Sequence, residues 1–334
     1  MRKLVIVSDA WEPQVNGVVR TLQTTIKHLD NIEVEVIHPG LFRNFALPKY
    51  SEIRVALPLG VGKKIAAAKA DHIHIATEGP LGWAAMLWCR WNRRDFSTSY
   101  HTQFPQYLRK IYGIPESLTY SVLRWFHSKA TSVMVNSVSM MDELKSKGFK
   151  NLKMWSRGVD TQVFRPDGPT YGRIDALRGP IALNVGRVSA EKNLEAFYEE
   201  FLFSPFQKWT VVQVGDGPML EEYKHRYPNV HFIGALHGKE LAQAYRSADV
   251  FVFPSRSDTF GLVMLEAMAS GVPVVGYTVT GPVDVVAQDV SGCLGPDLAL
   301  QAEDALKLDR QDVIDHARTF SWRRCTDQFV KNLV

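Results

Sequence analysis

The chain has little cysteine and no long run of apolar residues. It has three cysteines in 334 residues, Cys89, Cys293 and Cys325, and none has Cys or His neighbours at metal-ligand spacing. This excludes a disulfide framework and a zinc site. The longest apolar stretches, such as residues 80–89 and 262–269, are well short of the ~20 residues of a membrane-spanning helix. We therefore expect a cytoplasmic chain, and the strand-like N-terminus does not resemble a signal peptide.

The composition is that of an ordinary globular protein, but its charges are unevenly distributed. Hydrophobic residues make up 46% and charged residues 22% of the chain, which excludes a disordered or low-complexity protein. Residues 1–160 hold 22 Lys and Arg against 13 Asp and Glu, whereas residues 161–334 hold 17 against 22. A sign asymmetry of this kind suggests that the basic half faces an anionic partner.

Short β-rich apolar runs alternate with segments of helical spacing along the whole chain. The expected strands cover residues 4–7, 34–37, 53–57, 72–76, 97–100, 133–135, 181–185, 211–214, 230–233, 250–253 and 274–277. This alternation predicts an α/β fold with parallel sheets that are covered on both faces. Residues 159–169 contain two prolines and a glycine without apolar periodicity, which is typical of a linker. We predict two doubly wound, Rossmann-like domains, 1–162 and 163–318, that face each other across a cleft.

The loop after the first strand holds a single glycine, Gly17, at the start of a helical segment. A dinucleotide fingerprint needs three glycines there, so NAD or FAD binding is disfavoured. One glycine still lets a backbone N–H approach a phosphate at the positive end of a helix. The alternative is that Gly17 only permits a tight turn.

Two cations follow the first strand of the second domain. Arg187 and Lys192 lie five residues apart in a strand-to-helix loop, where a guanidinium fork and an ammonium are suited to holding a diphosphate. Two solvated surface cations are the alternative, which their place at the carboxyl end of a strand disfavours. Gly215 and Gly217 follow the next strand, where they either expose backbone amides near the same edge or mark a turn.

Residues 254–271 carry the strongest motif. Asp258 and Glu266 flank seven residues that include Phe260, Gly261 and Leu262. A helix that begins near Phe260 would point its free N–H groups at a phosphate. Glu266 lies among apolar residues and needs hydroxyl or amide partners, which the hydroxyls of a ribose would supply. The alternative for Asp258 is a helix N-cap.

The arrangement Gly-Arg-x4-Lys-Asn, Gly-Asp-Gly-Pro and acidic-x7-Glu resembles family 4 of the retaining glycosyltransferases, over nearly the whole chain. The resemblance implies the GT-B fold. It also implies that Arg187 and Lys192 hold the donor diphosphate, that Glu266 binds the ribose, and that Gly17 adds a backbone amide to the diphosphate. Asp258 would contact hydroxyls of the donor sugar, although most members have Glu at this position. The remaining donor-binding candidates are Gly215, Gly217, Phe260, Gly261 and Leu262.

The first half narrows the resemblance to one branch. Residues 48–54, 76–83 and 99–107 resemble the branch that contains α-mannosyltransferases and sulfoquinovosyl- and glycosyl-diacylglycerol synthases. His101 lies in the third of these segments, where it is expected to reach the donor sugar or the acceptor, although a lone histidine is more often a packed or capping residue. Residues 319–334 resemble the C-terminal segment of the family, which packs back towards the first domain.

Glycosyl transfer develops negative charge on the leaving diphosphate while the sugar becomes oxocarbenium-like. Arg187, Lys192 and helix-end amides would stabilise that charge without a metal or another cofactor. Asp258 and Glu266 both fall in the donor half, unlike the two carboxylates of a retaining hydrolase. We therefore expect the mechanism that the family resemblance implies, which is retaining front-face transfer by a metal-independent hexosyltransferase without a covalent intermediate. The expected catalytic residues are His101, Asp258, Arg187 and Lys192.

Aromatic and cationic residues are interleaved over residues 82–94 and 104–129. This mixture suits a membrane interface; helices packed on the first sheet are the alternative, and the absence of a known nucleic-acid module argues against nucleic acid. The candidate acceptor or membrane residues are Glu78, Trp83, Trp88, Tyr107, Arg109, Lys110, Arg124 and Trp125. We therefore expect a lipid acceptor and a peripheral location on the anionic inner face of the membrane.

The predicted reaction moves a hexosyl or hexuronosyl group from a UDP-sugar, or alternatively a GDP-sugar, to a lipid such as diacylglycerol. Three alternatives stay open. One is a family 4 transferase, for example a mannosyltransferase, that acts on a soluble or polyprenyl-linked saccharide. The second is a nucleotide-sugar-binding module without turnover, and the third is a nucleotide-sugar epimerase of similar fold.

Overall fold

The computed structural model describes residues 2–14, 16–47 and 50–333, and only the backbone of residues 47, 50–53, 107, 110 and 111. The chain divides into an N-terminal domain, which ends at Arg157 and resumes at Trp322, and a C-terminal domain, Gly158–Ser321. The sequence placed these boundaries at 162 and 318. The difference arises because Val159 and Phe164 are buried in the C-terminal core, and the Val159 N–H donates to the Phe320 carbonyl at 3.1 Å.

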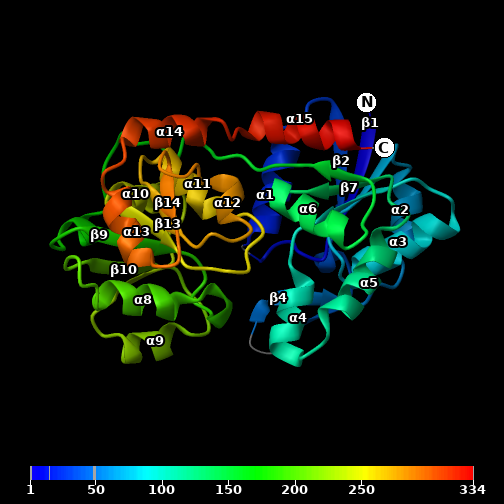
Figure 1. Ribbon diagram of the computed structural model, residues 1–334. Coiled ribbons are helices and arrows are strands. Elements are labelled where there is room, and N and C mark those ends of the chain that lie inside the picture. Colours follow the sequence, from blue (N-terminus) through cyan, green and yellow to red (C-terminus); the bar gives the residue numbers. More distant parts are fainter. Residues whose placement is uncertain (1, 15, 48–49, 334) are drawn as a thin grey trace. The chain divides into compact units, whose positions relative to one another are not determined.

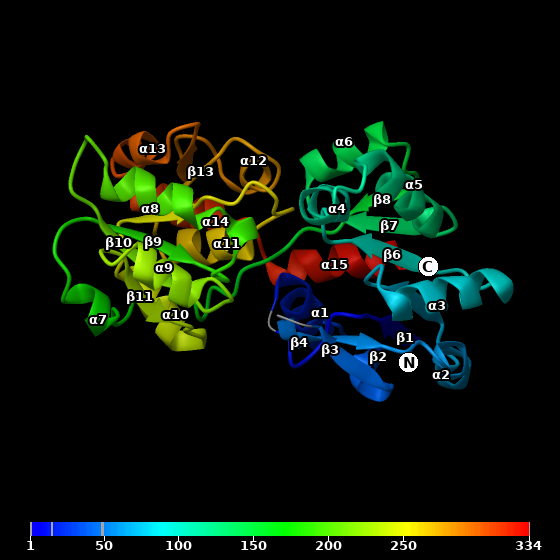
Figure 2. The same ribbon diagram turned by 90° about the horizontal axis from the view of Figure 1, so that it is seen from below.

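The N-terminal domain is a parallel sheet of six strands in the order β2-β1-β5-β6-β7-β8 with helices around it (Figures 1 and 2). Its elements are β1 (Arg2–Val7), α1 (Gly17–Lys27), β2 (Ile32–Ile37), η1 (Pro39–Leu41), β3 (Asn44–Leu47), β4 (Tyr50–Ala56), α2 (Val61–Ala68), β5 (His72–Ile75), α3 (Pro80–Trp91), β6 (Ser97–Tyr100), α4 (Phe104–Tyr112), α5 (Glu116–His127), β7 (Ser132–Val135), α6 (Val138–Ser146), β8 (Leu152–Met154) and α15 (Trp322–Asn332).

Burial explains why these segments take their places. The last four residues of β1 are fully buried, as expected of a parallel strand covered on both faces. Helix α1 begins after Asn16, whose side chain caps it by accepting from the Val18 and Val19 amides. Helix α15 lies alongside α1 (Figure 1) and buries Cys325 and Phe329 in the core of this domain.

One expected strand has a different role. The apolar run at residues 53–57 overlaps β4, which pairs antiparallel with β3 in a separate two-stranded sheet. The parallel sheet is completed instead by the three-residue strand β8. This strand has a lysine between two apolar residues and is not fully buried, so it forms no apolar run that would have indicated it.

The C-terminal domain is also a six-stranded parallel sheet, in the order β11-β10-β9-β12-β13-β14. Its elements are α7 (Gly172–Asp175), β9 (Ile181–Val185), η2 (Ala190–Lys192), α8 (Leu194–Leu202), β10 (Thr210–Val214), α9 (Leu220–Arg226), β11 (His231–Gly234), α10 (Gly238–Arg246), β12 (Val250–Phe253), α11 (Leu262–Ala269), β13 (Val274–Gly276), α12 (Pro282–Val285), β14 (Gly292–Leu294), α13 (Leu298–Ala305) and α14 (Arg310–Arg318).

This strand order is that of the Rossmann fold, and its direction reverses between β9 and β12. In the N-terminal domain the corresponding reversal lies between β1 and β5. Ligands of doubly wound sheets bind outside the carboxyl ends of the strands at such a switch point. The loops after these four strands are therefore where a site is expected.

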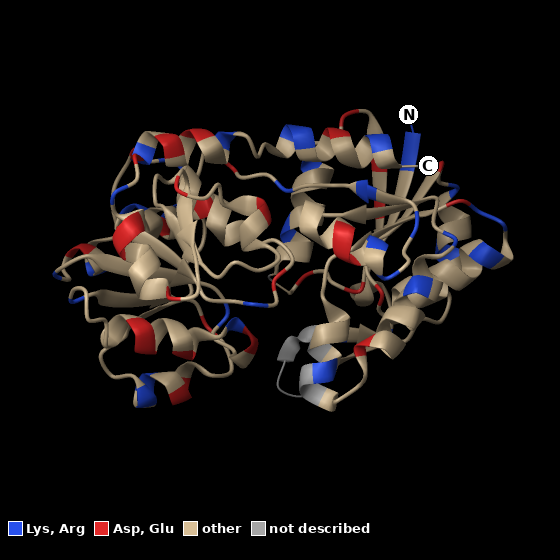
Figure 3. Cartoon of the chain, in the orientation of Figure 1, with Lys and Arg blue, Asp and Glu red and all other residues tan. Residues whose placement is uncertain are grey.

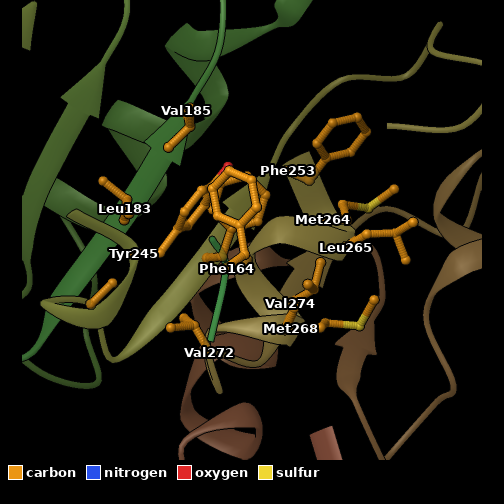
Figure 4. Close-up of a cluster of buried hydrophobic side chains, with 14 of the residues drawn as sticks. Phe164, Leu183, Val185, Tyr245, Phe253, Met264, Leu265, Met268, Val272 and Val274 are labelled. Carbon is orange, nitrogen blue, oxygen red and sulfur yellow. The ribbon is translucent and has the colours of Figure 1, made fainter. Parts of the chain in front are cut away.

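A single apolar cluster fixes α11 against the C-terminal sheet. Leu183 and Val185 of β9 and Phe253 of β12 lie in it with Met264 and Leu265 of α11 (Figure 4). Because all of these side chains are buried, the start of α11 is held rigidly beside the ends of β9 and β12.

The state of the cysteines and the length of the apolar helices were both predicted from the sequence. The three cysteines are buried and form no disulfide. Across the residues that the structure describes, no helix combines the length and the apolar character needed to span a bilayer.

Candidate functional site

Two predicted site residues meet at the switch point of the C-terminal domain. Lys192 follows β9 and Asp258 follows β12, and the Lys192 ammonium donates to both carboxylate oxygens at 2.8 and 2.9 Å. The Asn193 side chain ties the same two loops together by donating to the Pro254 carbonyl at 3.1 Å. Burial opposes ionisation of Asp258, but the charge and hydrogen bond of Lys192 outweigh it and lower the pKa of this carboxyl. The Asp258 carboxyl is therefore ionised at neutral pH.

The other predicted cation of this loop is Arg187, which comes two residues after β9 and has a half-buried side chain. The chain thus places a guanidinium and an ammonium after one strand, and a carboxylate after its neighbour. The two cations can hold an anion there, provided that the ammonium exchanges Asp258 for it.

Glu266 lies in α11 and is buried at 6% exposure. The Tyr245 hydroxyl, from α10, donates to one of its carboxylate oxygens at 2.9 Å. This bond fixes the direction of the carboxylate and offsets part of the cost of burying it. Sequence reasoning missed Tyr245, because an aromatic residue on the apolar face of a helix indicates core packing and gives no sign of a polar contact.

The start of α11 offers backbone amides to a ligand. Its N-cap is Gly261, which has a φ of +90° and no side chain to cap the first turn. A Cβ atom at Gly261 would lie 2.9 Å from the Phe253 ring and 2.8 Å from Met264 Cε, so both conformation and space require glycine. Phe260 is buried and Leu262 is half-buried beside this turn.

Gly215 and Gly217 do not expose their amides as the sequence suggested. The Gly215 N–H donates to the Gly234 carbonyl at 2.8 Å, and the Gly217 N–H donates to the carboxylate of the preceding residue at 2.7 Å. A Cβ atom would lie 1.9 Å from the Gly186 oxygen at the first position and 2.3 Å from the Val188 oxygen at the second. Glycine is needed here because the loops after β9 and β10 pack backbone against backbone.

A buried aspartate marks the switch point of the N-terminal domain. Asp9, after β1, accepts from the Leu81 and Gly82 amides at 2.8 and 3.1 Å and from the Thr77 hydroxyl at 2.9 Å. It therefore caps α3 and joins the loops after β1 and β5, a role that the sequence did not reveal. Burial raises its pKa despite these bonds. Gly17 begins α1, and its amide is not one of the two that the Asn16 cap uses.

His101 follows β6 and is buried, and both of its ring nitrogens meet protein groups. Arg157 Nη2 lies 2.8 Å from Nδ1, and Ser99 Oγ lies 2.9 Å from Nε2. Burial, and then the charge of Arg157, keep the pKa of His101 well below its usual value. The ring is neutral at physiological pH, so it can donate a hydrogen bond but does not serve as a cation.

Glu78 lies inside the N-terminal domain and not on its surface. Its side chain is 3% exposed and lies 3.3 Å from Nε2 of His127, near the end of α5. The other ring nitrogen of His127 lies 2.8 Å from the Thr98 hydroxyl of β6. A carboxylate buried in this way cannot take part in a membrane surface.

The predicted aromatic residues divide into packed and exposed groups. Trp83 and Trp88 are half-buried against the core, as the packing alternative expected. Trp83 stacks on Trp125 at 5.6 Å between ring centroids, and the Arg90 guanidinium covers the Trp125 ring at 4.5 Å. Trp125 stays 46% exposed, and Trp91, one turn after Trp88, is 90% exposed.

Helices α3 and α5 both expose apolar side chains, and we call this set of residues the α3–α5 face. They recur at helical spacing and are Leu87 and Trp91 of α3 and Leu118, Val122 and Trp125 of α5. Exposed Arg93, Arg94, Arg124 and Lys129 lie on or just after the same helices. Blue segments also recur around α2, α3 and α5 in Figure 3.

Four predicted residues contribute less to this face. Arg109 is exposed and pairs with Glu116 at 3.0 Å, while the Arg124 guanidinium donates to the Lys147 carbonyl at 2.7 Å. The side chains of Tyr107 and Lys110 lie outside the described residues.

Within residues 2–14, 16–47 and 50–333, no group of three or more His, Cys, Asp or Glu side chains could hold a metal ion.

Each half of the chain matches a family model. Residues 15–163 match the model described as Glycosyltransferase Family 4, and residues 179–308 match the model described as Glycosyl transferases group 1.

Three curated proteins show the relationship over most of the chain. Sulfoquinovosyl transferase SQD2 of Arabidopsis thaliana is 31% identical over 84% of the chain, which spans 60% of that protein. A GDP-mannose-dependent alpha-mannosyltransferase of Corynebacterium glutamicum is 30% identical over 87% of the chain and 76% of its own length. The alpha-monoglucosyldiacylglycerol synthase of Streptococcus pneumoniae is 26% identical, with shares of 82% and 71%.

Solved structures share the fold. Anabaena HepE, determined in complex with UDP and glucose, matches with a TM-score of 0.74 at 19% identity and covers 99% of both chains. Together with the two parallel-sheet α/β domains, this match confirms the GT-B fold that the motifs predicted.

Proposed function

Because the chain belongs to glycosyltransferase family 4, we propose that it transfers a hexosyl or hexuronosyl group from a UDP-sugar to a lipid such as diacylglycerol, with retention at the anomeric carbon. The observation that carries this proposal is the Lys192–Asp258 pair at the switch point of a Rossmann-like domain, with Arg187 in the same loop. A lysine and an arginine in one loop at this edge of the sheet are suited to binding a diphosphate.

The donor is held by the C-terminal domain in this proposal. Lys192 and Arg187 bind the diphosphate, and the uncapped amides that begin α11 add to the positive field there. Glu266, directed by Tyr245, accepts from the ribose hydroxyls. Asp258 is released from Lys192 when the phosphate arrives and turns to hydroxyls of the donor sugar. The UDP complex of HepE supports UDP as the nucleotide only through the shared fold.

The transfer breaks the bond between the anomeric carbon and the diphosphate oxygen, which keeps the electron pair. The acceptor hydroxyl forms the new bond on the same face of the sugar, and its proton passes to the leaving phosphate. Lys192 and Arg187 stabilise the charge that develops on the diphosphate, so the proposed reaction uses no metal ion. His101 takes part as a neutral hydrogen-bond donor near the reacting sugar, because its pKa is too low for a cation.

The acceptor side rests on the N-terminal domain. The α3–α5 face exposes tryptophan and aliphatic side chains beside arginines, a combination suited to the headgroup region of an anionic membrane. The glycolipid product in the name of the pneumococcal relative supports a lipid acceptor. We accordingly place the protein at the inner face of the membrane, held by that surface.

A second candidate function is mannosyl transfer from GDP-mannose to a soluble or polyprenyl-linked saccharide. The Corynebacterium glutamicum relative, named as a GDP-mannose-dependent alpha-mannosyltransferase, favours it.

Lipid extracts of a bacterium that expresses the protein test the proposal. Glu266→Ala is the inactive variant, and Glu222→Ala, an exposed glutamate of α9, is the matched control. Mass spectrometry should find a new hexosyl or hexuronosyl lipid with the wild type and with Glu222→Ala, and none with Glu266→Ala. Identical lipid extracts, together with transfer to soluble sugars in vitro, would instead support the second candidate.

A further inference from the structure

A buried arginine that sequence reasoning did not single out holds the ring of His101. Arg157 is 4% exposed and follows β8 in the N-terminal domain. Its Nη1 donates to the Trp155 and Ser156 carbonyls at 2.7 and 2.9 Å, and its guanidinium carbon lies 4.6 Å from the centroid of the Trp155 ring. No carboxylate in the described part of the chain bonds to it, which is unusual because a buried charge normally has a counter-ion.

The third contact of Arg157 determines where the proton of His101 lies. Arg157 Nη2 is 2.8 Å from His101 Nδ1, and a guanidinium has only donors. Nδ1 must therefore carry a lone pair, and the proton of the neutral ring is on Nε2. That N–H faces Ser99 Oγ at 2.9 Å, which accepts it.

The neighbouring groups complete a consistent chain of donors and acceptors. Ser99 donates its own hydroxyl proton to the Ala76 carbonyl at 3.2 Å, which leaves its oxygen free to accept from His74 Nε2 at 3.3 Å. His74 Nδ1 then accepts from the Ser97 hydroxyl at 2.9 Å. Every donor in this series of hydrogen bonds has an acceptor. The position of the His101 proton that Arg157 requires therefore agrees with the hydrogen bonds around it.

We propose that Arg157 is a positioning residue for glycosyl transfer, which locks His101 in the neutral form with its proton on Nε2. The inference rests on the proposed function, in which His101 faces the reacting sugar. Arg157 acts through His101 and does not itself touch the substrate. With its proton on Nε2, His101 has an N–H that can exchange its hydrogen bond to Ser99 for one to a sugar oxygen. The neutral ring also avoids placing an imidazolium beside an oxocarbenium-like sugar, where like charges would repel.

The titratable groups around His101 come from three elements. His74 of β5 lies on one side, Arg157 after β8 on the other, and the Cys325 thiol of α15 contacts the Ser156 carbonyl beside Arg157. Burial lowers the pKa of His74 to about 3, and burial raises that of Cys325, so both are neutral at physiological pH. Arg157 is therefore the charged group among these neighbours.

Nitrogen-15 NMR of the histidine rings tests the lock without any assay of activity. The variants are Arg157→Met, which removes the donor, and Arg157→Lys, which keeps one. Arg246→Met is the matched control, because the Arg246 guanidinium donates to the Pro169 and Arg165 carbonyls in the other domain and is unrelated to His101. Thermal unfolding checks that each variant is folded.

In the wild type, Arg157→Lys and Arg246→Met, His101 should keep a protonated Nε2 and an unprotonated Nδ1 from pH 8 to pH 5. In Arg157→Met the charge of Arg157 is gone while the burial remains, so the ring should be protonated at a higher pH than in the wild type, and the transfer rate should begin to fall at a correspondingly higher pH. A proton on Nδ1 in the wild type, or the same titration in wild type and Arg157→Met, would overturn the proposal. The proposed function would fail separately, through absence of the glycolipid.

Discussion

The two domains share a parallel six-stranded sheet, but they differ in how far the polar groups on and after its strands are buried. In the C-terminal domain the Lys192–Asp258 pair is partly open, with side-chain exposures of 28% and 27%. In the N-terminal domain His74, His101 and Arg157 are 0%, 9% and 4% exposed. One domain thus offers an ion pair that a ligand can open, whereas the other fixes its polar groups in a closed network.

The two domains also differ in net charge. The N-terminal domain, with α15, holds 25 Lys and Arg against 13 Asp and Glu, and the C-terminal domain holds 14 against 22. The C-terminal domain is acidic overall, although the loop after β9 carries the two cations that we propose for the diphosphate, Arg187 and Lys192. The comparison teaches that net charge and site charge are separate properties, and each can be altered by itself.

Removal of the ammonium at the open pair should have the largest effect. Lys192→Ala takes away one of the two cations proposed for the leaving diphosphate, and kcat/KM should fall roughly 10²–10³-fold. The exposed Lys208 of the same domain provides the control Lys208→Ala, which should keep wild-type activity. A loss below tenfold in Lys192→Ala would show that this pair does not bear the diphosphate.

The closed network should make stability depend on pH. Burial lowers the pKa of His74 to about 3, so the unfolded state binds a proton below pH ~6.5 that the folded state does not. This contribution is fully present above pH 6.5 and is lost as the pH falls, by about 2 kcal/mol at pH 5. His101 acts in the same direction, since burial and Arg157 also lower its pKa.

Urea unfolding at a series of pH values measures this effect. His74→Gln should reduce the slope of unfolding free energy against pH, between pH 6 and 4, by about 1.4 kcal/mol per pH unit. The curves above pH 7.5 serve as the internal reference. An unchanged slope would mean that His74 is protonated in the folded protein.

A smaller effect is expected from the hydroxyl that directs Glu266. Tyr245→Phe removes a hydrogen bond to a buried carboxylate, and we expect UDP to bind about tenfold more weakly. Preference for UDP over its 2′,3′-dideoxy analogue should also shrink, which calorimetry can measure. The control is Tyr198→Phe, which removes an equally buried hydroxyl bond, to Gln213, in the same domain. Equal losses for both nucleotides would assign Tyr245 a purely structural role.

The smallest effect concerns the α3–α5 face. Trp91→Ala should weaken binding to vesicles that contain phosphatidylglycerol by about 1 kcal/mol, or roughly fivefold, in a flotation assay. Phe203→Ala is the control, because Phe203 is 79% exposed in the other domain. Binding of the wild type should also weaken as salt is raised. Equal effects of the two substitutions would remove the distinction between the domains as membrane surfaces.

The sequence predicted the fold well where every residue of a strand is buried. The runs at 97–100, 181–185 and 250–253 coincide with β6, β9 and β12. The three-residue strands β8 and β14 have no periodicity to detect, and β4 resembles a sheet strand although it belongs to a hairpin. Local patterns do not report which partner a strand pairs with, because pairing depends on contacts distant in sequence.

The site could be predicted where residues follow neighbouring strands. Lys192 and Asp258 were singled out from their loops, and the strand order brings them together. Arg157, Tyr245 and Asp9 were missed, because each acts through a partner that the fold alone places beside it. Glu78 was misplaced, since a carboxylate near aromatic and basic residues gives no sign that it pairs with a buried histidine.

A cell-free transfer assay tests the central claim most directly. The protein is given UDP-glucose labelled in the sugar and vesicles of phosphatidylglycerol with diacylglycerol, and the label is followed into the organic phase. We expect labelled glycolipid from the wild type and a rate roughly 10²–10³-fold lower from Lys192→Ala at every vesicle concentration. For Trp91→Ala, the rate of glycolipid formation should return towards that of the wild type when more vesicles are added. Two results would contradict the division of donor and acceptor between the domains. One is label found only in water-soluble products, whether a UDP-sugar or a GDP-sugar is supplied. The other is an equal return of glycolipid formation in both variants when vesicles are added.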